Sequence, residues 1–252
     1  MKKFFLILAI ILAGISLNAQ KLQEDAFAKA NAYYNNSQYD SALIVYNKII
    51  GEGYVSTPIL YNMGNAHFKM RNVPMSIYYY ERALKLDPNN EDVRSNLAIA
   101  NSLISDKIEP LPVFFMTRWH RSIGNIFTAD GWAVFSIIIF AILLLAVFLY
   151  FTARTRGLKK SMFFIGIFTL IFFVLSVSFA AQKSNYMKSN NEAIIMKPTI
   201  TVKSSPSSSG VDLFVLHEGS KVEIKETEDN WSKIRMADGS VGWLPEDALM
   251  RF

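Results

Sequence analysis

Residues 61–68 of this 252-residue chain read YNMGNAHF, and a similar pattern of small and aromatic side chains occurs 34 residues earlier. The residues paired at this spacing are Ala30 with Gly64, Tyr33 with His67, Ala42 with Ser76, and Tyr46 with Tyr80. A fixed period of this length is typical of stacked pairs of helices, in which each pair needs its neighbours to bury an apolar face. The sequence therefore predicts an all-α solenoid over residues 20–108.

The same stretch, followed by Ser76 and the terminator LDP at residues 86–88, resembles a tetratricopeptide repeat almost position by position. The resemblance implies a more divergent first repeat over about residues 23–53. It also implies a third repeat over about residues 91–108 that is reduced to one helix, as the solvated cap of a terminal repeat. The fold expected for this region is a tetratricopeptide solenoid.

Four positions of the second repeat carry packing expectations. Small side chains such as Gly64 and Ser76 are expected where two helices cross closely, and a large side chain at Gly64 should unfold the region. Pro88 ends the second helix because proline lacks a backbone donor. His67 stands where tyrosine is usual, so we interpret it as a packing side chain and not as a metal ligand.

The resemblance further implies a concave peptide-binding surface formed by the first helix of each repeat. The candidate groove residues are Asn31, Tyr34, Asn35, Tyr61, Asn65, Phe68 and Lys69. Tyr61, Asn65 and Lys69 follow the spacing i, i+4, i+8 and should form one exposed stripe. Their replacement by alanine is therefore expected to change stability little.

Some tetratricopeptide proteins clamp a C-terminal carboxylate between lysines and asparagines. Asn31 and Asn62 fill the asparagine places in this chain, but Phe27 and Asp92 stand where the basic residues are expected. This departure argues against a carboxylate ligand of that kind.

Hydrophobic residues make up 51% of the chain and charged residues only 19%, a balance too apolar for an ordinary soluble protein of this length. Two uncharged segments, residues 131–153 and 161–182, are each long enough for a transmembrane helix. Residues 1–19 have the basic start, short apolar core and small-residue end of a signal peptide; an uncleaved anchor is the alternative. The sequence thus predicts an exported chain with a transmembrane helical hairpin.

The loop between the two apolar segments, residues 154–160, carries Arg154, Arg156, Lys159 and Lys160. Cytoplasmic loops are enriched in Lys and Arg, so this loop is predicted to be cytoplasmic. Both flanking regions then face the other side, the periplasm of a bacterial inner-membrane protein. Neither apolar segment contains an ionisable residue, which favours a membrane anchor over an ion pathway.

Two shorter segments join the hairpin to its neighbours. Residues 109–130 mix aromatic and basic side chains, among them Trp119, Arg118 and Arg121, and are predicted to be an interfacial linker at the surface of the lipid bilayer. Residues 183–191 are polar and are expected to be a spacer.

Residues 192–252 alternate apolar and polar side chains between turn residues, which predicts a small all-β domain. The stretch resembles the bacterial SH3-like family, whose fold is a small barrel. Gly219, Gly239 and Gly242 fall where tight turns or close backbone approach need glycine, and Trp231, Ile234 and Trp243 are interpreted as core residues. Relatives of this kind are associated with cell-wall material, so peptidoglycan is a candidate partner by analogy. The fold class expected overall is a multidomain membrane protein.

A signal peptide, tetratricopeptide repeats, a transmembrane hairpin and a terminal SH3-like domain together resemble the BatE-type proteins of the bacterial aerotolerance (Bat) operon. The resemblance implies a scaffold that partners other Bat proteins, which carry von Willebrand factor A domains, in tolerance of oxygen or envelope stress. The rival reading is a peptidoglycan-binding or wall-sensing anchor that acts through the SH3-like domain.

Enzymatic and nucleic-acid functions fit the sequence poorly. The chain has no cysteine, and His67, His120 and His217 lie in three different segments, so no catalytic or metal-binding cluster and no cofactor site is expected. The net charge of +5 comes from the flanks of the apolar segments: residues 109–191 hold eight basic and two acidic side chains. A nucleic-acid module would carry its own basic face.

Overall fold

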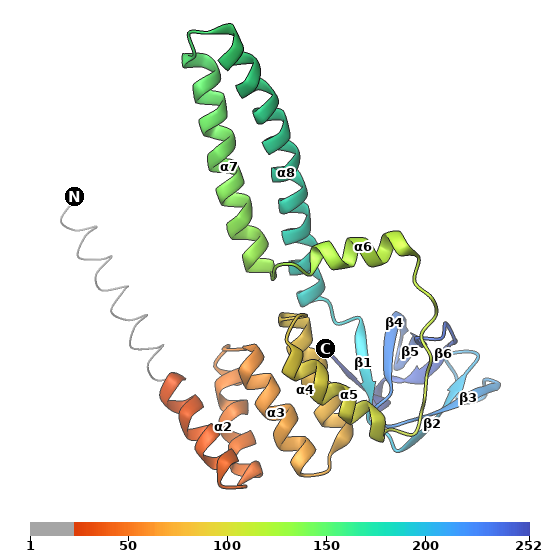
Figure 1. Ribbon diagram of the computed structural model, residues 1–252. Coiled ribbons are helices and arrows are strands. Elements are labelled where there is room, and N and C mark those ends of the chain that lie inside the picture. Colours follow the sequence, from red (N-terminus) through yellow and green to blue (C-terminus); the bar gives the residue numbers. More distant parts are fainter. Residues whose placement is uncertain (1–22) are drawn as a thin grey trace. The chain divides into compact units, whose positions relative to one another are not determined.

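The computed structural model describes residues 23–252, and the segment expected to be a signal peptide lies outside the described residues. The described chain contains a helical N-terminal region, two long apolar helices and a C-terminal antiparallel β-domain (Figure 1). This confirms the multidomain fold class predicted from the sequence. Contacts divide the chain into two compact units: the repeats up to Leu84 with residues 90–110 and 191–252, and residues 85–89 with 111–190.

The repeat region is built from successive antiparallel helices. They are the helix over residues 23–35, α2 (Tyr39–Gly51), α3 (Thr57–Lys69), α4 (Val73–Leu86) and α5 (Glu91–Leu103). Pro58 lies in the first turn of α3, where its missing N–H is not needed. The side chain of Asn90 caps α5 by accepting a hydrogen bond from the backbone N–H of Val93 at 3.1 Å. Helix α4 ends two residues before Pro88, as expected.

The residues that recur at 34-residue spacing form the core of the repeats. Ala30, Ala42, Tyr46, Ser76 and Tyr80 are each at most 1% exposed. At Gly64 a Cβ atom would lie 2.5 Å from Cε1 of the Tyr80 ring. Space at this position is as tight as the sequence suggests, but the nearest atoms belong to that ring and not to the backbone of a crossing helix.

In the second unit the long apolar helices are α7 (Ala129–Thr152) and α8 (Arg156–Lys188), which run antiparallel (Figure 1). Both are long and apolar enough to cross a membrane. The hydroxyl oxygens of Ser136 on α7 and Ser176 on α8 lie 2.9 Å apart in the contact between the helices. Ser136 is 7% exposed and Ser176 only 1%.

Helix α8 differs from the sequence-based boundaries at both ends. It begins at Arg156, after Thr155, whose side chain accepts from the backbone N–H of Leu158, so much of the expected loop is helical. It continues to Lys188, through most of the segment expected to be a spacer. Residues 183–188 contain neither glycine nor proline, so no local signal ends the helix there, and polarity alone does not stop it.

Helix α6 (Phe115–Gly124) occupies the middle of the segment predicted to be an interfacial linker. Phe115, Met116 and Trp119 share one side of this helix and are 64%, 49% and 63% exposed. In Figure 1 α6 extends to the side from the lower end of the α7–α8 pair. The indole N–H of Trp132 fixes the end of α6 by donating to the carbonyl oxygen of Gly124 at 2.9 Å.

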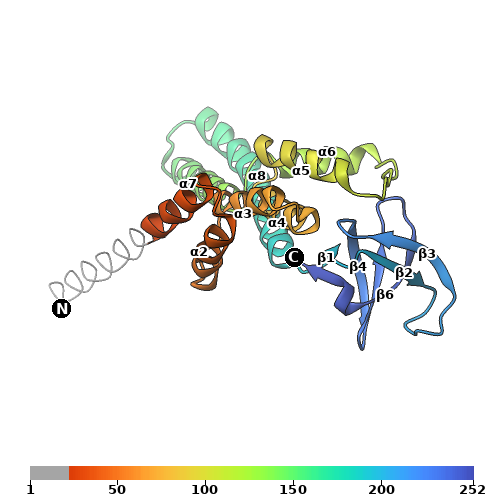
Figure 2. The same ribbon diagram turned by 90° about the horizontal axis from the view of Figure 1, so that it is seen from below.

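The C-terminal domain is a single antiparallel sheet that curls into an SH3-like barrel. Its strands are β1 (Glu192–Ile195), β2 (Thr199–Lys203), β3 (Asp212–His217), β4 (Lys221–Glu228), β5 (Trp231–Arg235), β6 (Val241–Pro245) and β7 (Leu249–Arg251). The order across the sheet is β3-β2-β6-β5-β4-β1-β7. Figure 2 shows the same strands from below.

Three glycines of the barrel hold the places expected of them. Gly219 and Gly239 have φ of +89° and +90°, which other residues rarely adopt, and a Cβ at Gly242 would collide with Val202. Among the expected core residues, Ile234 is fully buried and Trp243 is 8% exposed. Trp231 is only half-buried, because it begins the solvent-exposed end of the β4–β5 hairpin.

The repeats and the barrel contact each other within the first unit, although residues 111–190 separate them in the sequence. One carboxylate oxygen of Asp106 accepts hydrogen bonds from the backbone N–H of His217 at 2.8 Å and the hydroxyl of Ser220 at 2.6 Å. The ammonium of Lys221 lies 2.9 Å from a carboxylate oxygen of Glu81 on α4.

Candidate functional site

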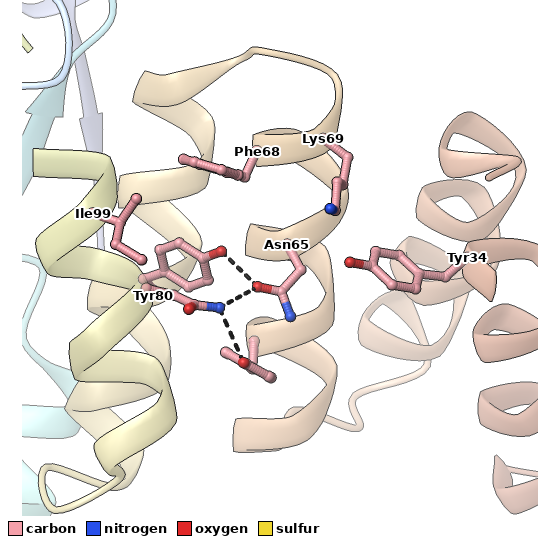
Figure 3. Close-up of a pocket in the computed structure, with 8 residues that line it drawn as sticks. Tyr34, Asn65, Phe68, Lys69, Tyr80 and Ile99 are labelled. Carbon is pink, nitrogen blue, oxygen red and sulfur yellow. Dashed lines mark hydrogen bonds between the residues drawn. The ribbon is translucent and has the colours of Figure 1, made fainter. Parts of the chain in front are cut away.

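A hollow of about 300 Å³ opens on the repeat region, between the first helix, α3, α4 and α5. Its lining residues are Tyr34, Tyr61, Asn65, Phe68, Lys69, Tyr80, Asn96 and Ile99 (Figure 3). Helix α3 supplies four of them, Tyr61, Asn65, Phe68 and Lys69. The hollow is therefore a groove along α3, and we call it the repeat groove.

The floor of the repeat groove is a hydrogen-bonded triad of side chains from three helices. Asn65 Oδ1 accepts hydrogen bonds from the Tyr80 hydroxyl at 2.6 Å and from Nδ2 of Asn96 at 2.8 Å. The second bond joins consecutive repeats, since Asn96 lies on α5. Nδ2 of Asn96 also lies 3.0 Å from the hydroxyl oxygen of Tyr61. These contacts, drawn in Figure 3, hold polar groups at fixed positions along the groove.

An equivalent triad occurs 34 residues earlier in the chain. Asn31 Oδ1 accepts from the Tyr46 hydroxyl at 2.5 Å and from Nδ2 of Asn62 at 2.9 Å. Asn31, Tyr46 and Asn62 each precede their counterpart Asn65, Tyr80 and Asn96 by 34 residues. The repeat thus reproduces a hydrogen-bond pattern as well as an apolar core.

Burial keeps both tyrosines of the triads in their neutral, donating form. Tyr46 and Tyr80 are at most 1% exposed, and burial is the main reason that the pKa of each is raised to about 12. Lys69 is the one charged side chain among the groove-lining residues, and it is exposed. The groove therefore offers aromatic surface, fixed amide and hydroxyl groups and a single positive charge.

The structure brings five of the seven predicted groove residues together: Tyr34, Tyr61, Asn65, Phe68 and Lys69. The other two lie elsewhere. Asn31 is held in the first triad, and Asn35 is exposed one position beyond Tyr34 and does not line the hollow.

Three lining residues were missed by the sequence reasoning. Tyr80 and Ile99 come from helices that were assigned to packing or to a cap, and Asn96 from the same cap helix. For Asn96 a signal existed, because it follows Asn62 by one full period. Ile99 is not among the residues paired at 34-residue spacing, so the sequence could not show that it lines the groove. It is 53% exposed in the structure.

The exposed stripe expected for Tyr61, Asn65 and Lys69 needs correction. Lys69 is exposed, but Asn65 and Tyr61 are half-buried and hydrogen-bonded to neighbouring helices. Spacing along one helix predicted the shared face correctly but could not show that α5 covers part of it.

His67 packs against an aromatic ring of the next helix. Its imidazole stacks on the ring of Tyr79 with centroids 5.3 Å apart and an interplanar angle of 8°. Burial lowers the pKa of His67 and favours the neutral ring. Across residues 23–252 no group of three or more His, Asp or Glu side chains could hold a metal ion.

Comparisons with known proteins agree with this architecture. Residues 58–90 match the family model described as tetratricopeptide repeat, and residues 198–250 match the one described as bacterial SH3 domain. A search of curated proteins finds no match to the chain. Both matched families are interaction domains, and the first match covers α3 and α4, which form most of the repeat groove.

Proposed function

We propose that the chain is a non-enzymatic scaffold of the bacterial inner membrane, in which α7 and α8 span the bilayer and the repeats and the barrel face the periplasm. The apolar surface of both helices supports spanning. In the most apolar 18-residue stretch of each helix, only 11% of the stretch is buried. A core helix of a soluble protein would be mostly buried. A lipid environment would cover side chains such as Ile137, Phe151 and Phe168, which are 62% to 75% exposed.

The contact between the repeats and the barrel is the observation that carries this proposal. Asp106 and His217 lie on opposite sides of the hairpin in the sequence, yet their side chains meet at 2.7 Å between Oδ1 and Nδ1. Such a contact requires both domains to be on the same side of a membrane. An even number of spans between them, as α7 and α8 would provide, satisfies this requirement.

The charges near the short connection support a cytoplasmic position for it. Arg154, Arg156, Lys159 and Lys160 lie between the apolar stretches, and basic residues are retained on the cytoplasmic side. Reporters fused after Lys107 and after Phe252 should be active outside the cytoplasm, and one fused after Gly157 should be active inside. Opposite sidedness of the first two would contradict the hairpin topology.

The repeat groove is the proposed recruiting surface of the scaffold. Its aromatic side chains and fixed amides suit a segment of another protein, and the resemblance to BatE-type proteins suggests other Bat proteins with von Willebrand factor A domains. Tyrosine is enriched among the few residues that dominate binding at such surfaces. The proposal concerns membrane or periplasmic protein partners in tolerance of oxygen or envelope stress.

Affinity capture from native membranes tests the groove. The double variant Lys69→Glu/Ile99→Ser changes two exposed side chains that line the hollow, and it should retrieve the partners at less than about a tenth of the normal yield. Lys48→Glu/Ile44→Ser is the matched control, because it makes the same chemical changes at exposed positions of α2 outside the hollow. Equal yields from both variants would exclude the repeat groove as the recruiting surface.

A second candidate function is peptidoglycan binding through the barrel, favoured by the match to the bacterial SH3 family over residues 198–250. Around the edge strand β3, the side chains of Val211, Leu213 and Val215 are 69%, 48% and 47% exposed and leave a surface open to a ligand. Cosedimentation of the full-length protein with purified sacculi would favour this function. Capture of membrane proteins without binding to sacculi would favour the scaffold.

A further inference from the structure

The segment that follows α5 faces the barrel with every second residue. Ile104, Asp106 and Ile108 are half-buried, whereas Leu103, Ser105, Lys107 and Glu109 are exposed. Ile108 packs against the core of the barrel, and Ile104 lies at Gly219. This alternation is that of an extended strand with one covered side. We call residues 104–108 the docking segment.

Gly219 makes the close approach of the docking segment possible. A Cβ at this position would lie 2.5 Å from Cγ2 of Ile104 and 3.3 Å from Cδ1 of Ile77 on α4. The backbone of Gly219 also has φ of +89°. The turn between β3 and β4 therefore fits against two isoleucines of the repeat region, of which Ile77 is fully buried.

Polar contacts surround this apolar centre. The Asp106 carboxylate, 13% exposed, receives three hydrogen-bonding groups from the turn: the His217 backbone N–H, the His217 ring and the Ser220 hydroxyl. Lys221 bridges Glu81 of α4 at 2.9 Å and Glu192 of β1 at 3.0 Å. A carboxylate satisfied by several donors at a buried site is a specific contact, because an alternative pose would leave it unpaired.

Helix α4 carries the barrel contact and the repeat groove on opposite sides. Ile77, Tyr78 and Glu81 face the barrel, and the Tyr78 ring lies 5.8 Å from the ring of Phe252 in an edge-to-face arrangement. The C-terminus lies beside α4 in Figures 1 and 2. Ser76, Tyr80 and Ala83 point the other way into the repeats, where Tyr80 donates to Asn65.

We propose that the barrel is the cap of the repeat array: it docks on the barrel-facing side of α4 and on the docking segment, and thereby holds α4 where Tyr80 completes the repeat groove. Solenoid arrays need such a cap, because the last repeat has no following repeat to cover its apolar face. Here the array ends with the single helix α5, which leaves Ile77, Tyr78 and Glu81 of α4 without a following helix, and the barrel covers this side of α4. The importance of this for recruitment rests on the proposed role of the groove, but the docking itself is tested without any partner.

Disulfide trapping in the full-length protein tests where the barrel docks. The chain has no cysteine, so an introduced pair supplies its only thiols. Asp106→Cys/Ser220→Cys replaces two side chains whose oxygens are 2.6 Å apart and should give an intramolecular disulfide in nearly all molecules under mild oxidation. Asn47→Cys/Ser220→Cys, with the first thiol at an exposed position of α2, should give none. An intermolecular product from the first pair would show that a second copy occupies the site. Tyr78→Cys/Phe252→Cys replaces two rings whose centroids are 5.8 Å apart and leaves Asp106 and Ser220 in place. No product from either pair would overturn the docking.

Amide hydrogen exchange in the full-length protein tests what docking does. Asp106→Ala should accelerate exchange of α4 amides by about tenfold or more, since the lost bonds involve a charged acceptor, while amides of β4 and β5 stay protected. Glu109→Ala, which removes an exposed carboxylate three residues away, should change nothing. If the barrel itself loosens in Asp106→Ala, Glu81→Gln probes the same contact from α4. Unchanged α4 protection in both interface variants would overturn the proposal, whether or not the groove recruits partners.

Discussion

Asn65 accepts two hydrogen bonds through one oxygen, from the buried Tyr80 hydroxyl and from Asn96 on the next repeat. Alanine at this position would leave both donors without this acceptor, and a buried unpaired donor costs about 1–3 kcal/mol. We expect Asn65→Ala to lower the free energy of unfolding by about 2 kcal/mol or more and the melting temperature of the helical signal by several degrees. Circular dichroism at 222 nm on the full-length protein measures both.

Asn35→Ala is the matched control for this prediction, because Asn35 is exposed at the end of the first helix and lies outside both triads. It should change stability by less than about 0.5 kcal/mol. Asn31→Ala should behave like Asn65→Ala, since Asn31 holds the equivalent place one repeat earlier. A stable Asn65→Ala variant would show that the triad contributes little to folding.

Gly64 leads to a second prediction at the same scale. The methyl group of Gly64→Ala would lie 2.5 Å from the ring of Tyr80, which is 1% exposed and is held in place by its hydrogen bond to Asn65. Overpacking of about 1–3 kcal/mol should outweigh the helix-forming advantage of alanine. Gly51→Ala places a methyl group where nothing lies within 4 Å and should leave the melting temperature unchanged or slightly higher. Equal melting temperatures for the two variants would contradict this reading of Gly64.

The sequence predicted that several of these residues lie in the core, because the 34-residue period marks individual positions along the chain. Tyr80 and Gly64 occur in pairs spaced by 34, and the structure places both in the core of the repeats. What periodicity cannot predict is which atoms meet. Asn65 was expected to be a freely exposed groove residue, yet α5 brings Asn96 against it.

At the level of elements, the pairing of α7 with α8 depends on small polar residues in an otherwise apolar contact. The Ser136 and Ser176 hydroxyls, 2.9 Å apart, are buried between the helices. Hydrogen bonds between helices in a membrane are worth about 0.6–1.7 kcal/mol. Ser176→Ala should lower the free energy of unfolding of the protein in detergent by that amount. The corresponding fall in melting temperature is measured by differential scanning fluorimetry with the intrinsic signal. Ser178→Ala, at an exposed position two residues further, should have no effect, and equal shifts for the two variants would exclude the bond as a source of stability.

The sequence composition predicted that α7 and α8 exist and are helices, but it did not predict where α8 ends. Two uncharged runs predicted α7 and α8, because long apolar segments have few alternatives to a helix. The end of α8 was missed, since Lys183 to Lys188 are polar but lack a helix-stopping residue, and Ser189 is the first with extended backbone.

At the level of the whole molecule, the docking of the barrel on the repeats could not be derived from either domain alone. Asp106 and His217 are 111 residues apart, and neither is among the residues paired by the 34-residue period. Periodicity and motifs within a segment predict its secondary structure and its packing against neighbouring segments. A contact between ends of the chain depends on shape, such as the missing Cβ of Gly219 opposite Ile104, which no periodicity records.

The ionisable groups of the docking contact predict how it responds to pH. Burial alone would raise the pKa of Asp106, but hydrogen bonds from Ser220 and His217 outweigh it and hold the pKa below its usual 3.8. Docking is then stabilised by this carboxylate above pH about 4, and the stabilisation is lost as the pH falls through the lowered value. Burial alone would lower the pKa of Lys221, but Glu81 and Glu192 raise it above its usual 10.5, so its contribution persists up to that pH.

Energy transfer between dyes on introduced cysteines, one at Asn47 and one at Ser208, reports docking in the full-length protein, because the chain has no other thiol. The signal should fall as the pH is lowered below about 4. In Asp106→Asn, docking at pH 7 should be weaker by about 1.5–3 kcal/mol, the value of hydrogen bonds to a charged group, and the acid step should shrink.

Acid also weakens the barrel itself, where bonds from Arg251 and Ser232 lower the pKa of Glu246. The tryptophan fluorescence of the protein, to which Trp231 and Trp243 of the barrel contribute, must therefore stay native over the step. A full acid step in Asp106→Asn with native tryptophan fluorescence would assign the pH response to a group other than Asp106.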